Sequence, residues 1–157
     1  MDSYLYLKLL HILSATILAG TGIGTAFFMF MASRSDDIHA IAVTTRHVVL
    51  ADWIFTTPAI VIQLVTGIWL MKMLGYSFTS PWFITSIGLF IFIGACWIPV
   101  VFIQYQLRAI AITQLAKSTI EPRFRQLMRR WTILGILAFT AIVVIFWIMV
   151  VKPLSVT

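Results

Sequence analysis

Apolar side chains fill four long stretches of the chain, and the polar residues gather between them. The stretches run over Tyr4–Met31, Val48–Met71, Trp82–Ile103 and Trp131–Val151. A helix rises about 1.5 Å per residue, so about 20 apolar residues cross a hydrocarbon core of about 30 Å. The pattern predicts an all-α membrane protein, an antiparallel four-helix transmembrane bundle.

The composition agrees with this fold class. Of the 157 residues, 61% are hydrophobic and only 10% are charged, which does not fit a soluble domain. The stretches leave little chain between them, so we expect a single domain over residues 1–157. The only cysteine, Cys96, lies in the third stretch, so an internal disulfide is excluded.

Positive charge is placed unevenly around the stretches. Of the 11 Lys and Arg residues, three lie on the side of the two termini: Lys8, Lys72 and Lys152. The other eight lie in or beside the first and third loops: Arg34, Arg46, Arg108, Lys117, Arg123, Arg125, Arg129 and Arg130. This bias predicts cytoplasmic first and third loops in a bacterial inner membrane, with both termini periplasmic. Basic residues that flank apolar spans also indicate contact with the lipid bilayer rather than with nucleic acid.

Capping signals mark three helix starts. Asp36 and Asp37 suit the beginning of the second helix, which would place Ile38, Ile41, Thr45, Val48 and Asp52 on one face. Ser80-Pro81 is typical of the start of the third helix. Residues 118–121, Ser-Thr-Ile-Glu, form a capping-box pattern just before Pro122 and the last helix.

His11 is the first candidate for chemistry. It lies on one stripe of the first helix with Tyr4, Lys8, Ser14 or Ala15, Gly22 and Ala26, and we expect this stripe to face the bundle interior. A neutral imidazole there is a candidate metal or haem ligand or a proton relay. The alternative is a hydrogen bond to a neighbouring helix.

A haem on His11 would need another sixth ligand or none. His47 lies at the opposite edge of the bilayer, about 25 Å away along the normal, so it cannot share the iron. The remaining options are Met71, Met149, Gln63 or the His11 of a second protomer. Of these, Gln63 is the candidate that we assign to the cofactor site with His11.

Small residues follow His11 along the first helix. Gly20, Gly22, Gly24 and Ala26 form two overlapping small-xxx-small pairs, which permit close approach of another helix or of a flat cofactor. Gly22 is therefore a candidate cofactor contact, and helix packing is the alternative.

Asp52 is the second ionisable residue within a span, and ionisable residues at such depth are functional candidates. Pro58 and Pro99 free backbone carbonyls nearby, which suggests a polar pocket that opens to the cytoplasm. The alternative is a structural ion pair, with Arg129 or Arg130 as the expected partner. Asp52 and Lys8 are the candidate catalytic residues.

Two resemblances add to this interpretation. The segment Tyr6–Leu13, followed by Ala19-Gly20, resembles the first helix of the HemJ-type membrane protoporphyrinogen oxidases, in which a histidine matching His11 is an essential haem-linked residue. Over its whole length the chain resembles a bacterial family described as predicted integral membrane proteins. The segments that carry this likeness are Arg46–Trp53, Thr56–Pro58, Gly94–Val100 and Lys152-Pro153.

These observations predict a membrane redox protein that binds haem b or is linked to quinone, with His11 as the metal ligand. A different class is also consistent with the sequence. The chain would then be a non-catalytic accessory or assembly subunit that contacts a membrane protein partner, or a second copy of itself, through the glycine face.

Overall fold

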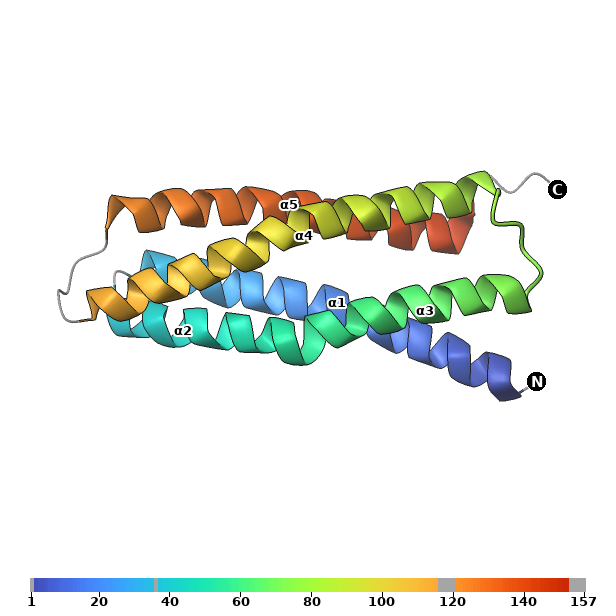
Figure 1. The fold of residues 1–157 in the computed structure, drawn as a ribbon, viewed down its shortest axis with the longest axis horizontal. Coiled ribbons are helices and arrows are strands. Elements are labelled where there is room, and N and C mark those ends of the chain that lie inside the picture. The colour runs from blue at the N-terminus through green and yellow to red at the C-terminus, as the bar shows by residue number, and fades with distance from the viewer. Residues whose placement is uncertain (1, 36, 116–120, 153–157) are drawn as a thin grey trace.

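The computed structural model describes residues 2–35, 37–115 and 121–152, and every regular element in this part of the chain is helical (Figure 1). The elements are α1 (Asp2–Arg34), α2 (Ile38–Ala51), the π-helical turn η1 (Asp52–Thr56), α3 (Thr57–Met73), α4 (Pro81–Gln114) and α5 (Pro122–Val151). Because α2, η1 and α3 are continuous, they make four helices, all apolar and long enough to cross a membrane. The prediction of an all-α protein with four spanning helices is confirmed.

The second long helix begins where the sequence predicts. Asp37 is the N-cap of α2, and its carboxylate accepts hydrogen bonds from the backbone N–H groups of His39 and Ala40. The predicted inward face is also correct, since Ile38, Ile41, Thr45, Val48 and Asp52 are all buried.

A π-helical turn interrupts this helix at Asp52. The backbone N–H of Thr57 bonds to the carbonyl oxygen of Asp52 five residues earlier, and the Thr57 hydroxyl donates to the same oxygen at 2.9 Å. Pro58 follows directly and has no N–H of its own to donate. The carbonyl oxygen of Asp52 in this wide turn therefore finds its hydrogen-bond donors within the same helix. The turn also points the Asp52 side chain toward α4. Single π-helical turns of this kind occur often at functional sites.

The last two helices begin at prolines. Pro81 opens α4 after Ser80, as predicted, although the Ser80 hydroxyl donates to the carbonyl of Ser77 rather than to the helix. Pro122 opens α5 with Glu121 as its N-cap residue and without a side-chain capping bond. The rest of the predicted capping box, residues 118–120, lies outside the described residues.

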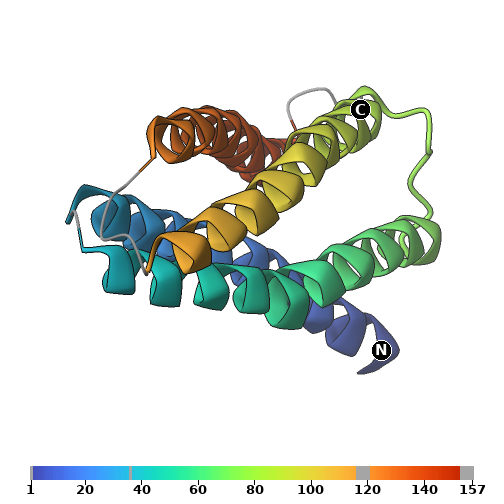
Figure 2. The ribbon, with the colours of Figure 1, turned by 60° about the vertical axis from the view of Figure 1, so that its left-hand side comes forward.

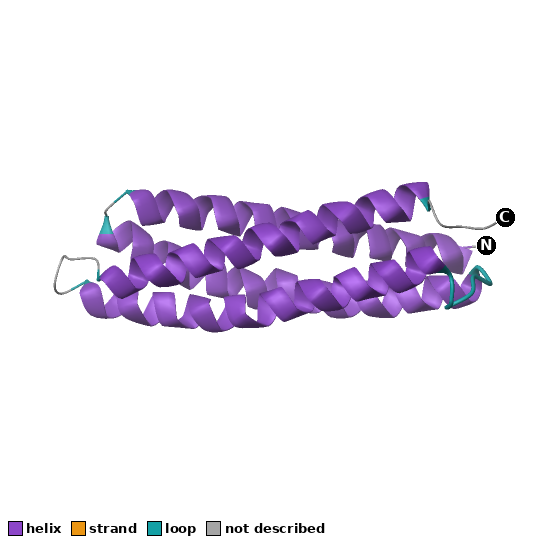
Figure 3. Cartoon of the chain, turned by 90° about the horizontal axis from the view of Figure 1, so that it is seen from above, coloured by secondary structure: helices purple, strands orange, loops and turns teal. Residues whose placement is uncertain are grey.

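The four long helices associate as two pairs. Figure 1 shows the chain reversing direction at each loop, and Figure 3 shows both ends of the chain at the same end of the bundle. α4 packs along α5, and α1 packs along α3, while α2 joins the pairs through its contacts with α4 (Figure 2). α3 makes no close backbone approach to α4 or α5 in the described chain. The pairs thus meet mainly over the half of the bundle that contains α2.

The hydrophobic core follows this division. The larger cluster lies around α2 and includes Met29, Ile41, Leu107, Phe124 and Trp131. A small second cluster of Met71, Trp82 and Ile148 closes the opposite end. There, Lys152 Nζ bonds to the Tyr76 hydroxyl at 3.0 Å and lies 4.3 Å from the centre of that ring. The end of α5 is thereby fixed to the α3–α4 loop.

Most other large apolar side chains face outward. Leu13, Phe28, Ile91 and Ile136 are 48%, 65%, 65% and 60% exposed, and such residues recur on all four long helices. An apolar exterior over this length is suited to lipid rather than to water.

Candidate functional site

His11 on α1 lies at the centre of a polar cluster that links α1 to α3. Its Nδ1 is 2.9 Å from the Thr66 hydroxyl, and its Nε2 is 3.1 Å from the Gln63 side-chain nitrogen. The Ser14 hydroxyl lies 2.5 Å from the Gln63 carbonyl oxygen. Ser14 and Thr66 are buried, whereas His11 and Gln63 are half-buried.

The direction of each hydrogen bond follows from Thr66. Its hydroxyl donates to the backbone carbonyl of Ile62 at 2.6 Å, so its oxygen is left to accept from His11 Nδ1–H. His11 Nε2 then carries the lone pair, which accepts from the Gln63 amide. Ser14 in turn donates to Gln63. The single Ser14 proton is shared between Gln63 and the backbone carbonyl of His11, and a neutral imidazole with its proton on Nδ1 satisfies the contacts of both ring nitrogens.

Gly67 allows the two helices to approach at this level. A Cβ added at Gly67 would lie 3.2 Å from His11 Cε1, which is closer than ordinary van der Waals contact. A glycine here leaves room for the imidazole ring against the α3 backbone.

Asp52 forms a second polar site, at the start of η1. It is 9% exposed, and its Oδ1 accepts a 2.8 Å hydrogen bond from the Thr56 hydroxyl. The Gln104 side chain of α4 lies beside the same carboxyl group. Its Oδ2 is buried and has no hydrogen-bond partner.

The expected ion pair between Asp52 and Arg129 or Arg130 is wrong. Both arginines are exposed on α5. Within the described residues, the groups beside the carboxyl are Thr56 and Gln104, and neither is charged. The π-helical turn aims Asp52 at α4 rather than at α5, which the sequence pattern could not indicate.

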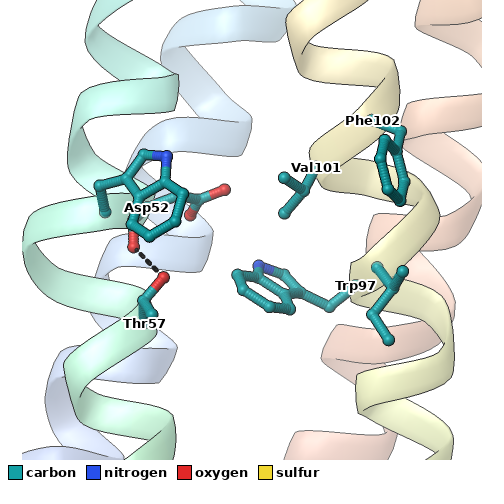
Figure 4. A pocket seen from close by; sticks show the side chains of 7 residues that line it. Asp52, Thr57, Trp97, Val101 and Phe102 are labelled. Carbon is teal, nitrogen blue, oxygen red and sulfur yellow. Dashed lines mark hydrogen bonds between the residues drawn. The ribbon is translucent and has the colours of Figure 1, made fainter.

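A cavity of about 200 Å³ lies between Asp52 and α4. Figure 4 shows the Asp52 carboxylate and the Trp97 indole facing this space from opposite sides. Trp97 Nε1 is buried and also lacks a hydrogen-bond partner. A cavity at Asp52 is thus present, but it is not the polar pocket that the sequence suggested, because its walls are mainly aromatic and apolar.

Of the remaining predicted site residues, only Gln63 joins His11. Lys8 is exposed on α1, with its Nζ 5.7 Å from the Tyr4 ring. Gly22 is exposed, and a Cβ there would meet nothing within 4 Å, so it does not approach another helix within this chain. The inward stripe of α1 continues from His11 and Ser14 through Leu18, Thr21, Thr25, Met29 and Ala32, and of the later expected residues Ala26 also packs against the core.

Sequence reasoning missed Thr66 and Ser14 as a Gln63 partner, whereas Trp97 was expected near Asp52. One signal was present in the second helix. Asp52, Thr56, Ala59, Gln63 and Thr66 are spaced by four, three, four and three residues, so they share one helical face. This polar and small stripe carries both sites, with Asp52 and Gln63 about 16 Å apart along the axis.

Within the described residues, no three His, Cys, Asp or Glu side chains converge as a metal-binding group. His11 is therefore a candidate for a single protein ligand rather than part of a metal cage. His39 and His47, on α2, are exposed and do not join it.

Four apolar helices, a lipid-suited exterior and buried polar groups between the helices define an integral membrane protein of the helical-bundle class. The chain belongs to the family described as predicted integral membrane protein (DUF2269), whose model matches residues 5–153. No curated protein and no solved structure matches the chain. The resemblance of the first helix to HemJ-type oxidases gains no support from these comparisons.

Proposed function

We propose that this protein is a membrane redox protein that binds haem b through His11 Nε2. The observation that carries the proposal is the Nδ1–H to Thr66 hydrogen bond, which leaves the lone pair on Nε2. Histidine ligands in metal sites usually donate their other ring N–H to a fixed acceptor, which sets the tautomer and the ring orientation. Haem would supply one-electron chemistry at this position.

His11 would be the one protein ligand that this cluster supplies, and Gln63 is the residue that would have to give way. Its amide nitrogen holds the Nε2 lone pair at 3.1 Å, so iron binding requires the Gln63 side chain to rotate to another rotamer. Gln63 was a candidate for the cofactor site, and its role here is to cap the ligand nitrogen until the cofactor binds. Met71 is packed against Trp82 and Ile148, which makes it a poor second ligand.

The test is a visible absorption spectrum of the protein purified from haem-replete cells. We expect a Soret band that is lost in His11→Ala and restored in part when imidazole is added to His11→Gly. His39→Ala and His47→Ala are matched controls that keep the band, because both side chains are exposed on α2. A colourless, folded protein, or a Soret band that survives His11→Ala, contradicts the proposal.

A second function is supported by a different observation. Glycines 20, 22 and 24 have nothing within 4 Å of an added Cβ, so this small-residue face of α1 is open in the single chain. As an accessory subunit, the protein would place this face against a membrane protein partner or a second copy. Native mass spectrometry separates these cases, since the accessory function requires an oligomer or complex that Gly22→Leu disrupts.

For either function we propose the same membrane placement, in a bacterial inner membrane with both termini periplasmic. The support is the charge bias, since the loops at the α2 end of the bundle are rich in arginine. His11 then lies toward the periplasmic side, and Asp52 lies toward the cytoplasmic side.

A further inference from the structure

The cavity beside Asp52 combines unsatisfied polar groups with aromatic walls. Asp52, Trp53 and Thr57 line one side, and Trp97, Val101 and Phe102 of α4 line the other (Figure 4). Trp53 and Phe102 are 58% and 64% exposed on the apolar exterior. The cavity is therefore bordered by residues that face lipid, so a molecule dissolved in the membrane can reach it.

Two polar atoms at this cavity have no partner in the described chain. Asp52 Oδ2 is an acceptor and Trp97 Nε1–H is a donor, and both are buried. A buried polar group without a hydrogen bond is costly, and most such groups in proteins have a partner. Trp53 differs, because its own Nε1–H donates to the Tyr105 hydroxyl at 2.6 Å. A hydroxyl group combines the donor that Asp52 Oδ2 lacks with the acceptor that Trp97 Nε1–H lacks.

The Asp52 carboxyl group is held in place by residues of its own helix. Thr56 holds Oδ1 by a 2.8 Å bond, and the π-helical turn is held by Thr57. Oδ2 is the carboxyl oxygen without a hydrogen bond in the described chain, with the Gln104 side chain beside the same carboxyl group. A phenolic hydroxyl donates one hydrogen bond and accepts others, and its ring can stack on indole and phenyl side chains.

We propose that this cavity binds the headgroup of a membrane-dissolved quinol, with a ring hydroxyl donating to Asp52 Oδ2 and accepting from Trp97 Nε1–H. The site discriminates by redox state. A quinol has hydroxyl donors that Oδ2 can accept, whereas the oxidised quinone has only carbonyl acceptors. The reduced form binds more tightly for this reason. The site is on the opposite half of the bundle from His11 and does not depend on haem.

The experiment measures binding of decylubiquinol and decylubiquinone to the detergent-solubilised full chain by anaerobic titration calorimetry. One hydrogen bond that only the quinol can donate to Asp52 should make the quinol bind up to about tenfold more tightly than the quinone. Asp52→Asn should abolish or reverse this preference, because its amide can donate to a carbonyl. The asparagine side chain has the same size and can still accept from Thr56.

Trp97→Phe tests the other hydrogen bond while it keeps an aromatic wall. We expect it to weaken binding of both forms by about tenfold. Trp131→Phe is the matched control, because Trp131 Nε1 is also buried and unpartnered but does not line this cavity. It should bind both forms as the unmodified protein does.

Three results would overturn the quinol site. The first is no binding of either form to the folded protein, as expected if the cavity holds only water. The second is equal or tighter binding of the quinone. The third is a Trp97→Phe variant that binds like Trp131→Phe. None of these results concerns the Soret band, so the quinol site and the haem proposal succeed or fail separately.

Discussion

His11 is held at both ring nitrogens, and the two hydrogen bonds have different consequences for the molecule. The bond from Nδ1 to Thr66 reaches an acceptor whose own proton is committed to Ile62 within α3. The bond to Nε2 comes from Gln63, a longer side chain with several rotamers. The bond to Thr66 fixes the imidazole, and the bond from Gln63 can be replaced by another partner of Nε2.

Thr66→Val tests the fixed bond. Valine has nearly the same shape but leaves Nδ1–H without an acceptor, so we expect stability to fall by about 0.6 kcal/mol and by no more than about 1.7 kcal/mol, the average and the maximum for hydrogen bonds between membrane helices. The measurement is the thermal midpoint in detergent. Thr16→Val is the control, because the Thr16 hydroxyl is exposed and bonds only to Ile12 of its own helix. Equal midpoints for the two variants would mean that Thr66 does not hold His11.

The neighbours of Asp52 give a second prediction about stability, opposite to the one that a buried ion pair would give. Removing one partner of a buried ion pair costs about 3–5 kcal/mol. Since Thr56 and Gln104 are the neighbours of the carboxyl, Arg129→Ala and Arg130→Ala should leave the thermal midpoint unchanged. Asp52→Asn should be at least as stable as the unmodified protein, because the amide oxygen still accepts from Thr56. A large loss of stability in either arginine variant would instead support an ion pair with Asp52.

At the scale of the helices, α1 and α3 depend on one glycine for their close approach. A Cβ at Gly67 would meet His11 Cε1 at 3.2 Å, whereas a Cβ at Gly22 would meet nothing within 4 Å. We therefore expect Gly67→Leu to destabilise the fold and to break the His11 cluster. Gly22→Leu should leave the thermal midpoint of the monomer unchanged or raise it, because leucine favours helix more than glycine does. If Gly22→Leu were the more destabilising of the two variants, the tight contact would lie at Gly22 instead.

The helices themselves could be predicted because their signals are local. The long apolar stretches, the Asp37 cap and the inward face from Ile38 to Asp52 all follow from spacing along a single helix. The rotation of α1 could not be predicted so well. A shift of one residue turns a helix by about 100°, which is enough to move the interior stripe from Gly22 to Thr21.

The two sites were harder to predict from the sequence, because both depend on which helices pack against each other. His11 and Gln63 were each candidates, but their contact requires α1 to lie along α3. Asp52 was identified as a buried acid, but its opposition to Trp97 depends on the π-helical turn and on the α2–α4 contact. Pairing of this kind is decided by side-chain packing over the whole bundle, which spacing in one helix does not encode.

At the scale of the whole molecule, the charge distribution determines the final prediction, the orientation in the membrane. Arginine-rich loops remain cytoplasmic, so the loop after α1 should be inside and the loop between α3 and α4 outside. Cys96 is buried and is the only native cysteine, so Cys96→Ala gives a background without reactive thiols. Ser35 and Ser77 are exposed in the two loops and provide matched positions for a single cysteine.

In intact cells, Ser77→Cys in this background should react with a membrane-impermeant maleimide, and Ser35→Cys should react only after the membrane is permeabilised. Equal labelling of both after permeabilisation is the control for accessibility. If Ser35→Cys reacts first in intact cells, the orientation is inverted. The His11 cluster would then lie toward the cytoplasm and the Asp52 cavity toward the periplasm. The geometry of both sites would be unchanged, but each site would lie toward the other compartment.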